Sequence, residues 1–347
     1  MAIAKLVLSV FFLSLSAAFS TTCPVYFKCD TGAAGLGDQL EHFVYCMYCA
    51  KLLNATVVSD GLNRGNMAFL RGGNQYGDAT ELLGLHSLAL GGVHTRDMPE
   101  KKMAMSEVLS LHEKLRDGSI APSCGVVYTS DIYSCPGHPL GSWCDLSPVY
   151  DCLKAVVWSL RSTHAREKCF QRKLGFHKFS PKVNIVWHVR VGDVCLHCEA
   201  GYFIELFALL KGASPAISSS HHLVFESQSE LPFLHGLAVF ENATFNSNST
   251  IAETICNFLT SDVLITSGSS FSAFIAAFSK PWSPVVFEER RKEAASREST
   301  VAHHFLNPEE AILMEDGRPT LSTEALSLVL ESVIGAKMRS LHFGGMS

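Results

Sequence analysis

Three short segments of the chain carry side chains that could bind an anion, and the first is His188-Val-Arg-Val-Gly-Asp193. His188 and Arg190 alternate, so in a strand both side chains point to one face. Arg190 is always charged and can bind two phosphate oxygens at once. Asp193 could orient Arg190 or pin the loop. The segment favours a phosphate or diphosphate ligand over the simpler alternative, a surface salt bridge between Arg190 and Asp193.

The second segment is Gly35-Leu-Gly-Asp-Gln39, which precedes a helical pattern. Glycines allow a backbone to approach a ligand, and the helix that follows offers free amide hydrogens and the positive end of its dipole. The same glycines could simply form a tight turn from strand to helix. Taken alone, the segment favours that tight turn.

The third segment lies within residues 262–281, where Thr-Ser-Gly-Ser-Ser connects an apolar strand to an apolar helix. Ser269 and Ser270 can cap the helix, or they can offer hydroxyls and amide hydrogens to an anion at its N-terminus. One serine is enough for a cap, and four serines lie around the start of the helix, at positions 267, 269, 270 and 272. An anion site is therefore favoured here.

Two cysteine pairs, Cys195-Leu-His-Cys198 and Cys46-Met-Tyr-Cys49, have a spacing that also occurs in zinc sites. Disulfides are the default in a secreted chain, so no metal site is expected. Cys46 and Cys49 fall within a predicted helix, where neighbouring cysteines more often pair elsewhere. The chain has no metalloprotease motif, nucleophile elbow or P-loop, so hydrolase and kinase chemistry lack support.

The N-terminus has the pattern of a cleaved secretory signal over residues 1–20. Lys5 precedes an apolar run, and small residues follow it. A retained short signal anchor is the alternative. The 12 cysteines and the glycosylation motifs at Asn54, Asn242 and Asn248 fit the same route. We expect a protein of the ER or Golgi lumen, or a secreted one.

Composition limits the class of protein further. Hydrophobic residues make up 47% of the 347 residues and charged residues 18%, which predicts a globular fold with a sizeable core. The formal net charge of -5 gives no broad basic field, so a nucleic-acid partner is not expected.

The first half is predicted to open with a β-loop-α-β unit. It consists of a strand at 25–28, a helix through 40–53 and a strand at 55–59. Further helices are predicted at 106–116 and 155–173. The basic, proline-containing connector at 173–182 is the predicted boundary between an N-terminal acceptor-side domain, 21–175, and a C-terminal nucleotide-sugar-binding domain, 176–347.

The second half alternates between strand and helix, which predicts a parallel sheet covered by helices. The expected strands lie at 183–189, 222–226 and 262–266, with another opening at 285, and the expected helices at 202–210, 250–259, 271–278 and 322–333. The predicted fold is α/β, with two Rossmann-type halves facing a central cleft where a ligand binds.

In order and spacing, the three segments together resemble the motifs of the fucosyltransferase superfamily, which includes α1,2-, α1,6- and protein O-fucosyltransferases. Gly35 to Gln39 resembles the family's first glycine loop, and His188 to Asp193 its His-x-Arg-x-Gly-Asp motif. Ser269-Ser-Phe-Ser272, after the strand led by Asp262, resembles its third motif. The resemblance covers roughly residues 32–292.

The resemblance implies a GT-B-like fold with GDP-fucose as donor in the cleft. It also implies an inverting transfer without a metal ion or other cofactor. Arg190 would hold the β-phosphate and stabilise the departing GDP, and His188 would lie beside the sugar nucleotide. Contacts to the donor would come from Ser269, Ser270 and Phe271 at the diphosphate, from Asp262 near the guanine or ribose, and from Gly37 and Asp38 in the first domain.

Two departures from the family pattern matter. Asp38 stands where the family commonly has asparagine, so it either points away from the diphosphate or acts as the acceptor-side base. Val191 replaces a second arginine that is frequent in the α1,6 branch. Candidates for the general base are Asp38, Glu41 and Glu199.

Three functions stay open at this point. The leading hypothesis is fucosyl transfer to a glycan or a protein hydroxyl in the secretory pathway. The second is a non-catalytic secreted protein on the same fold that binds glycans or nucleotides, and the third is a zinc-dependent secreted enzyme.

Overall fold

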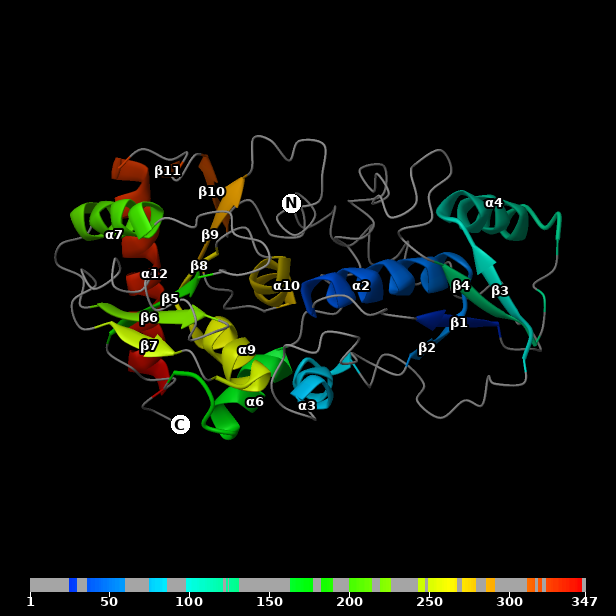
Figure 1. Ribbon diagram of the computed structural model, residues 1–347, viewed down its shortest axis with the longest axis horizontal. Helices are drawn as coiled ribbons and strands as arrows, with labels where there is room; N and C mark the ends of the chain where they lie inside the picture. Colours follow the sequence, from blue (N-terminus) through cyan, green and yellow to red (C-terminus); the bar gives the residue numbers. More distant parts are fainter. Residues whose placement is uncertain are drawn as a thin grey trace.

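The computed structural model describes residues 25–29, 36–59, 75–85, 98–120, 123, 125–130, 163–176, 182–189, 200–213, 219–225, 243–246, 249–266, 270–278, 285–290, 311–315, 318–319 and 323–344. These residues form two α/β halves, each built around its own sheet (Figure 1). The fold class predicted from the sequence, α/β with two Rossmann-type halves, is confirmed.

The first half has a four-stranded sheet in the order β2-β1-β4-β3, and every pairing in it is parallel. Its strands are β1 (Tyr26–Cys29), β2 (Thr56–Ser59), β3 (Glu100–Met103) and β4 (Val127–Ser130). Its helices are α2 (Leu36–Leu52), α3 (Gln75–Leu82) and α4 (Met105–Arg116). The parallel pair β1–β2, joined through α2, confirms the predicted β-loop-α-β unit.

The second half has a seven-stranded sheet in the order β11-β10-β9-β8-β5-β6-β7. Its strands are β5 (Val183–Val189), β6 (Ser219–Phe225), β7 (Thr244–Asn246), β8 (Val263–Ile265), β9 (Val285–Arg290), β10 (Ala311–Glu315) and β11 (Arg318–Pro319). Counted from β5, six strands have the order 3-2-1-4-5-6 of a doubly wound nucleotide-binding sheet. The pairing of β10 with β11 is antiparallel, which the alternation of elements did not predict.

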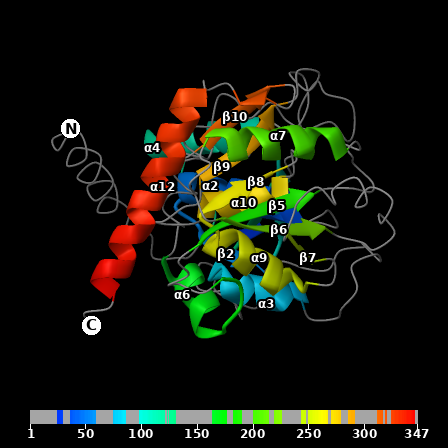
Figure 2. The same ribbon diagram turned by 90° about the vertical axis from the view of Figure 1, so that its left-hand side faces the viewer.

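Helices cover both faces of this sheet. They are α6 (Thr163–Gln171), α7 (Ala200–Ala213), α9 (Ile251–Thr260), α10 (Ser270–Phe278) and α12 (Thr323–Gly344). Along β5 the side chains alternate: Trp187 packs with α7 and α12, while Val186 packs with α9 and α10. Figure 2 shows α7 and α12 on one side of the sheet and α9 on the other. Because both faces are covered, every residue of β5 is buried.

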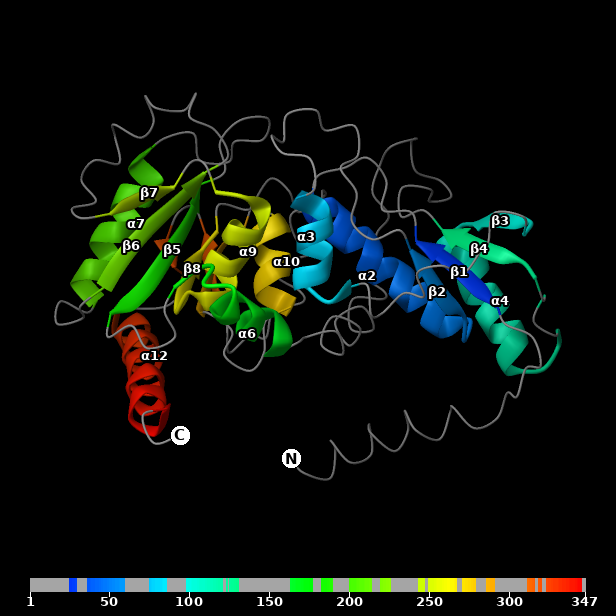
Figure 3. The ribbon, with the colours of Figure 1, turned by 90° about the horizontal axis from the view of Figure 1, so that it is seen from below.

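One hydrophobic core continues from the first half into the second. It includes Phe43 of α2 together with Phe258 of α9 and Phe274 of α10. Helix α10 packs against α2, and α3 packs against α9 and α6 (Figure 3). The two sheets lie on either side of the predicted boundary at residue 175. Helix α6 precedes that boundary, yet its Cys169 forms a disulfide with Cys256 of α9.

A second disulfide joins Cys29, at the end of β1, to Cys46 of α2. Cys46 therefore pairs outside its own helix, as its helical position suggested. Cys49 is a buried free thiol, and desolvation raises its pKa to about 12. Cys195 and Cys198 lie outside the described residues.

Among the described helices, none is long and apolar enough to cross a membrane. The predicted signal, residues 1–20, lies outside the described residues.

Candidate functional site

The second sheet has its topological switch point between β5 and β8. From β5 the chain goes to β6 on one side, and it returns to the other side of β5 as β8. Loops that leave such a pair in opposite directions open a crevice at the carboxyl ends of the strands, where doubly wound sheets bind their ligands. The segment that begins at His188 ends β5, and the serine-rich segment follows β8. Two of the three sequence motifs are thus brought to one place.

His188 is the penultimate residue of β5 and is only 1% exposed. Its Nδ1 atom lies 3.0 Å from Oγ of Ser272, in the first turns of α10. Its ring contacts Phe258 of α9, with centroids 5.1 Å apart, and meets Phe271 edge-on at 6.1 Å. The imidazole is thus enclosed by the two helices that flank β8.

Helix α10 begins at Ser270, close after the end of β8 at Ile265. Its N-terminus therefore lies at the carboxyl edge of the sheet, where the first amide hydrogens of a helix have no intrahelical acceptor and the helix dipole has its positive end. No acidic residue occurs in its first turn. Phe271, half-buried, joins the aromatic contact with His188 and Phe258. An anion would find a favourable field at this helix start.

Asp262 does not join the cluster formed by His188, Ser272 and the two phenylalanines, Phe258 and Phe271. It precedes β8, so it lies at the amino edge of the sheet, and its carboxylate accepts a hydrogen bond from the backbone N–H of Asn184 at 2.8 Å. It also lies near Arg166 of α6, whose pKa is lowered by burial and raised in part by the Asp262 charge. A structural role explains Asp262, and the predicted contact to guanine or ribose has no support from this placement.

The first motif lies at the corresponding position of the first sheet. Strand β1 is flanked by β2 and β4, and α2 follows it, so the start of α2 lies at the carboxyl edge of that sheet's switch point. Gly37 and Asp38 fall in the first turn of α2, where Gly37 is buried. Gln39 is fully buried, which indicates a structural role for the last residue of the motif.

Arg190, Asp193 and Ser269 lie outside the described residues, as does the general-base candidate Glu199. The side chains of Asp38, Glu41 and Ser270 are likewise not described, so their predicted roles stay predictions. Among the described residues, no group of three or more His, Cys, Asp or Glu side chains is arranged to hold a metal ion.

Two members of the cluster, Ser272 and Phe258, carry no assigned role in the sequence reasoning. Ser272 does give a signal: it is a polar residue in the strongly apolar helix segment Ser-Phe-Ser-Ala-Phe-Ile-Ala-Ala-Phe. A buried polar residue in such a helix needs a hydrogen-bond partner. The partner comes from 84 positions away in the sequence, so it could not be identified without the fold.

No family model and no curated protein matches the chain. Solved structures similar to it are glycosyltransferases. E. coli heptosyltransferase WaaC with ADP is 11% identical at a TM-score of 0.46, covering 89% of this chain and 99% of that one. POFUT1 in complex with GDP-fucose is 12% identical at 0.45, covering 78% and 98%. The family 9 glycosyl transferase from Veillonella parvula is 10% identical at 0.44, covering 92% and 99%. Sequence identities of 10–12% and TM-scores below 0.5 do not carry a function to this chain, so the function has to be argued from its own residues.

Proposed function

We propose that this protein is a glycosyltransferase that transfers fucose from GDP-fucose to a glycan or protein hydroxyl, with inversion and without a metal ion. The observation that carries the proposal is the position of the motifs. The segment that begins at His188 ends β5, and the segment that begins at Thr266 follows β8. These two strands flank the switch point of a sheet with nucleotide-binding strand order. The glycine segment occupies the equivalent position in the first half.

The chemistry of the site suits a diphosphate leaving group. As the bond to the sugar breaks, negative charge grows on the β-phosphate, and groups fixed in advance near that oxygen stabilise the transition state most. The N-terminus of α10 offers such groups at the carboxyl edge of the sheet. Arg190, directly after the end of β5, would add a fixed positive charge. Among the base candidates, Asp38 and Glu41 lie in the first turns of α2, on the acceptor side.

The compartment is part of the proposal. The predicted signal over residues 1–20 and the disulfides Cys29–Cys46 and Cys169–Cys256 support folding in the oxidising lumen of the secretory pathway. Acceptor hydroxyls on glycans and glycoproteins are available there. GDP-fucose would be the donor substrate, and the chain's own side chains would supply the catalytic charge.

The test is GDP release from GDP-fucose by the purified protein. We expect slow release from the wild type, because water can replace an absent acceptor, and loss of release in Arg190→Ala. Arg116→Ala is the matched control, because Arg116 is an exposed residue in the last turn of α4. Release by Arg190→Ala at the wild-type rate would refute the assignment of Arg190 and the site with it.

A second candidate is a non-catalytic secreted protein on the same fold that binds glycans or nucleotides. It is favoured by Asp38, which puts a carboxylate near the predicted diphosphate, and by Val191, which replaces a second arginine. Calorimetry separates the two candidates. Affinity for glycans with no affinity for GDP would select the binding protein, whereas affinity for GDP together with GDP release from GDP-fucose supports the transferase.

A further inference from the structure

We propose that Ser272 is a positioning residue that holds His188, and with it the carboxyl end of β5, in a fixed place relative to the N-terminus of α10. The inference rests on the proposed function, because its consequence is a correctly placed pair of phosphate-binding elements. His188 then acts through its hydrogen bond to Ser272, and no contact between His188 and the donor is needed.

Burial is the first argument. His188 is 1% exposed and Ser272 is fully buried, and their Nδ1 and Oγ atoms are 3.0 Å apart. Phe258 and Phe271 pack around the imidazole ring. In such apolar surroundings water cannot replace the hydrogen bond, so the loss of either partner is unfavourable. The pair is therefore strongly favoured over either residue alone.

The second argument is that apolar residues would serve packing equally well. The other side chains of β5 that face α9 and α10 include Val186, and α10 buries Phe274, Ile275 and Ala276 around Ser272. Apolar contacts tolerate small shifts of a strand along a helix, whereas a hydrogen bond between two buried atoms is satisfied only over a few tenths of an ångström. This polar pair therefore fixes the register between β5 and α10.

The third argument is the position of the pair. His188 is separated from Arg190 by one residue, and Ser272 is the third residue of α10. The hydrogen bond thus joins the carboxyl end of β5 to the first turn of α10. Catalytic groups work only when held close to their productive geometry, and a displacement of about 1 Å can cost 100-fold in rate. A hydrogen bond at this point fixes the distance between the end of β5 and the start of α10.

The experiment compares amide replacements of His188. Asparagine places a polar group near the position of Nδ1, where it can still meet Ser272, whereas glutamine places it near Nε2. We expect His188→Asn to bind GDP within about threefold of the wild type. His188→Gln and Ser272→Ala should each lose about tenfold or more. The double variant Ser272→Ala, His188→Gln should bind GDP no worse than the weaker-binding single variant, because both changes remove the same hydrogen bond.

Ser261→Ala is the control for a merely structural effect. Ser261 is also a buried serine, and its hydroxyl donates to the carbonyl of Phe258 at 2.8 Å, but it lies at the far end of α9, beside Asp262. We expect Ser261→Ala to lower the Tm about as much as Ser272→Ala does while leaving the GDP affinity unchanged.

Three outcomes would overturn the inference. Ser272→Ala that folds and binds GDP with the wild-type Kd removes the positioning role while leaving the proposed function intact. His188→Gln that binds better than His188→Asn shows that Nε2 contacts the donor directly. Wild-type protein that binds no GDP and releases none from GDP-fucose removes the proposed function, and this inference with it.

Discussion

At the residue scale, His221 is held neutral by its hydrogen bonds. The indole N–H of Trp187 donates to Nδ1 of His221 at 3.1 Å, and Nε2 lies 3.1 Å from Oγ of Ser219. An indole can only donate, so Nδ1 must be unprotonated and the ring proton sits on Nε2, where it donates to Ser219. Burial, assisted by the neighbouring His222 and by Lys211, lowers the pKa of His221 to about 4.

This lowered pKa predicts a loss of stability in acid. The folded pKa lies below the ordinary value of 6.5, so the stabilisation is complete above pH 6.5 and is lost as the pH falls toward about 4. Full loss corresponds to roughly 3 kcal/mol. Urea unfolding at pH 7.0 and pH 4.5 measures it. His221→Asn, which can still accept from Trp187 but does not titrate, should lose less stability over this range. Equal losses in the two proteins would contradict the assignment.

At this scale the sequence could identify candidate site residues but not the residues with which they form hydrogen bonds. The alternation of His188 with Arg190 predicted a strand end at the site, and β5 ends there. The bond from His188 to Ser272 needed the fold, because it joins segments from two different strand-helix units. Asp262 shows the opposite case: a residue that precedes a parallel strand must lie at the amino edge, so its distance from the site could have been deduced from its order in the chain.

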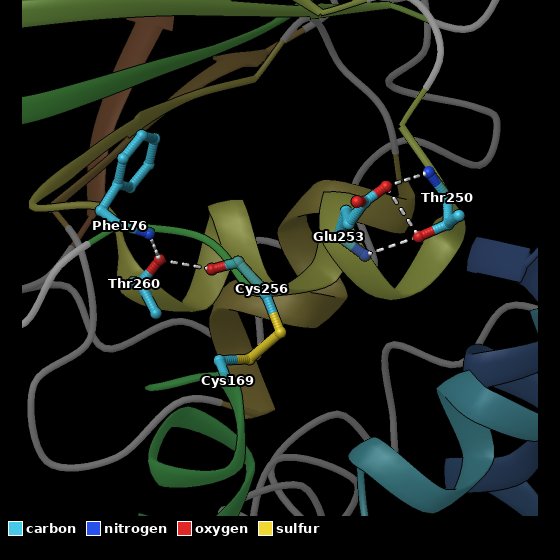
Figure 4. The surroundings of a disulfide bond; sticks show 6 residues. All are labelled: Cys169, Phe176, Thr250, Glu253, Cys256 and Thr260. Atoms are coloured by element: carbon cyan, nitrogen blue, oxygen red, sulfur yellow. Dashed lines mark hydrogen bonds between the residues drawn. A yellow bond between two sulfur atoms is a disulfide. The ribbon is translucent and has the colours of Figure 1, made fainter. Parts of the chain in front are cut away.

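At the element scale, the predicted connector is attached to α9. The backbone N–H of Phe176 donates to Oγ1 of Thr260 at 3.0 Å, and that hydroxyl donates to the carbonyl of Cys256 at 2.6 Å (Figure 4). Gly175 has a φ of +75°, and a Cβ built there would clash with the same carbonyl and hydroxyl. A glycine is therefore required at position 175 for two separate reasons, backbone conformation and space.

A matched pair of alanine variants separates these reasons. Gly118 has a φ of +77° with open space around its missing Cβ, so Gly118→Ala should cost only about 1 kcal/mol of backbone strain. Gly175→Ala adds the clash with α9 and should cost about 2–4 kcal/mol. Urea unfolding of both variants measures the difference. Equal costs would mean that the connector does not pack on α9 as closely as described.

The turn from α2 to β2 predicts a modification. Asn54 is exposed, has a φ of 49° and begins the motif Asn54-Ala-Thr56. An exposed acceptor on a turn can carry an N-linked glycan if the chain enters the secretory lumen. We expect protein secreted from eukaryotic cells to lose one glycan in Asn54→Gln, seen by peptide-N-glycosidase digestion and mass spectrometry of the tryptic peptide. An unmodified Asn54 peptide in secreted protein would contradict this prediction.

Elements with a clear hydrophobic period were predictable, and elements without one were not. Val183–Val189 was predicted with its observed bounds, and α4 and α10 began one residue earlier than predicted. Strand β3 was missed because three of its four residues, Glu100, Lys101 and Lys102, are charged and exposed. An edge strand of this kind is held by its pairing with β4, and charged side chains protect its open edge.

At the scale of the whole molecule, the two halves share a hydrophobic core, and each half contains a disulfide. Cys169–Cys256 joins α6 to α9 across 87 positions, while Cys29–Cys46 closes a loop of 17 within the first half. By loop-closure entropy the longer loop contributes about 4.5 kcal/mol and the shorter about 3 kcal/mol. The link next to the predicted boundary is therefore expected to be the more stabilising one.

Double alanine variants of each cysteine pair test this order. The Cys169→Ala, Cys256→Ala protein should lose more stability in urea unfolding than the Cys29→Ala, Cys46→Ala protein, by about 1–2 kcal/mol. All four cysteines are buried, so the cavities that the two double variants leave are comparable. A larger loss from the short loop would contradict the expected order.

The central claim is that the switch point between β5 and β8 binds a guanine nucleotide sugar, and a thermal-shift panel tests it most directly. Ligand at about 100 times its Kd stabilises a folded protein by about 2.7 kcal/mol, which raises the Tm by several degrees. We predict that GDP and GDP-fucose raise the Tm of the wild type but not of Arg190→Ala, while ADP, UDP and their sugars do not. A panel in which no nucleotide shifts the Tm, or in which ADP shifts it as much as GDP, would contradict the claim.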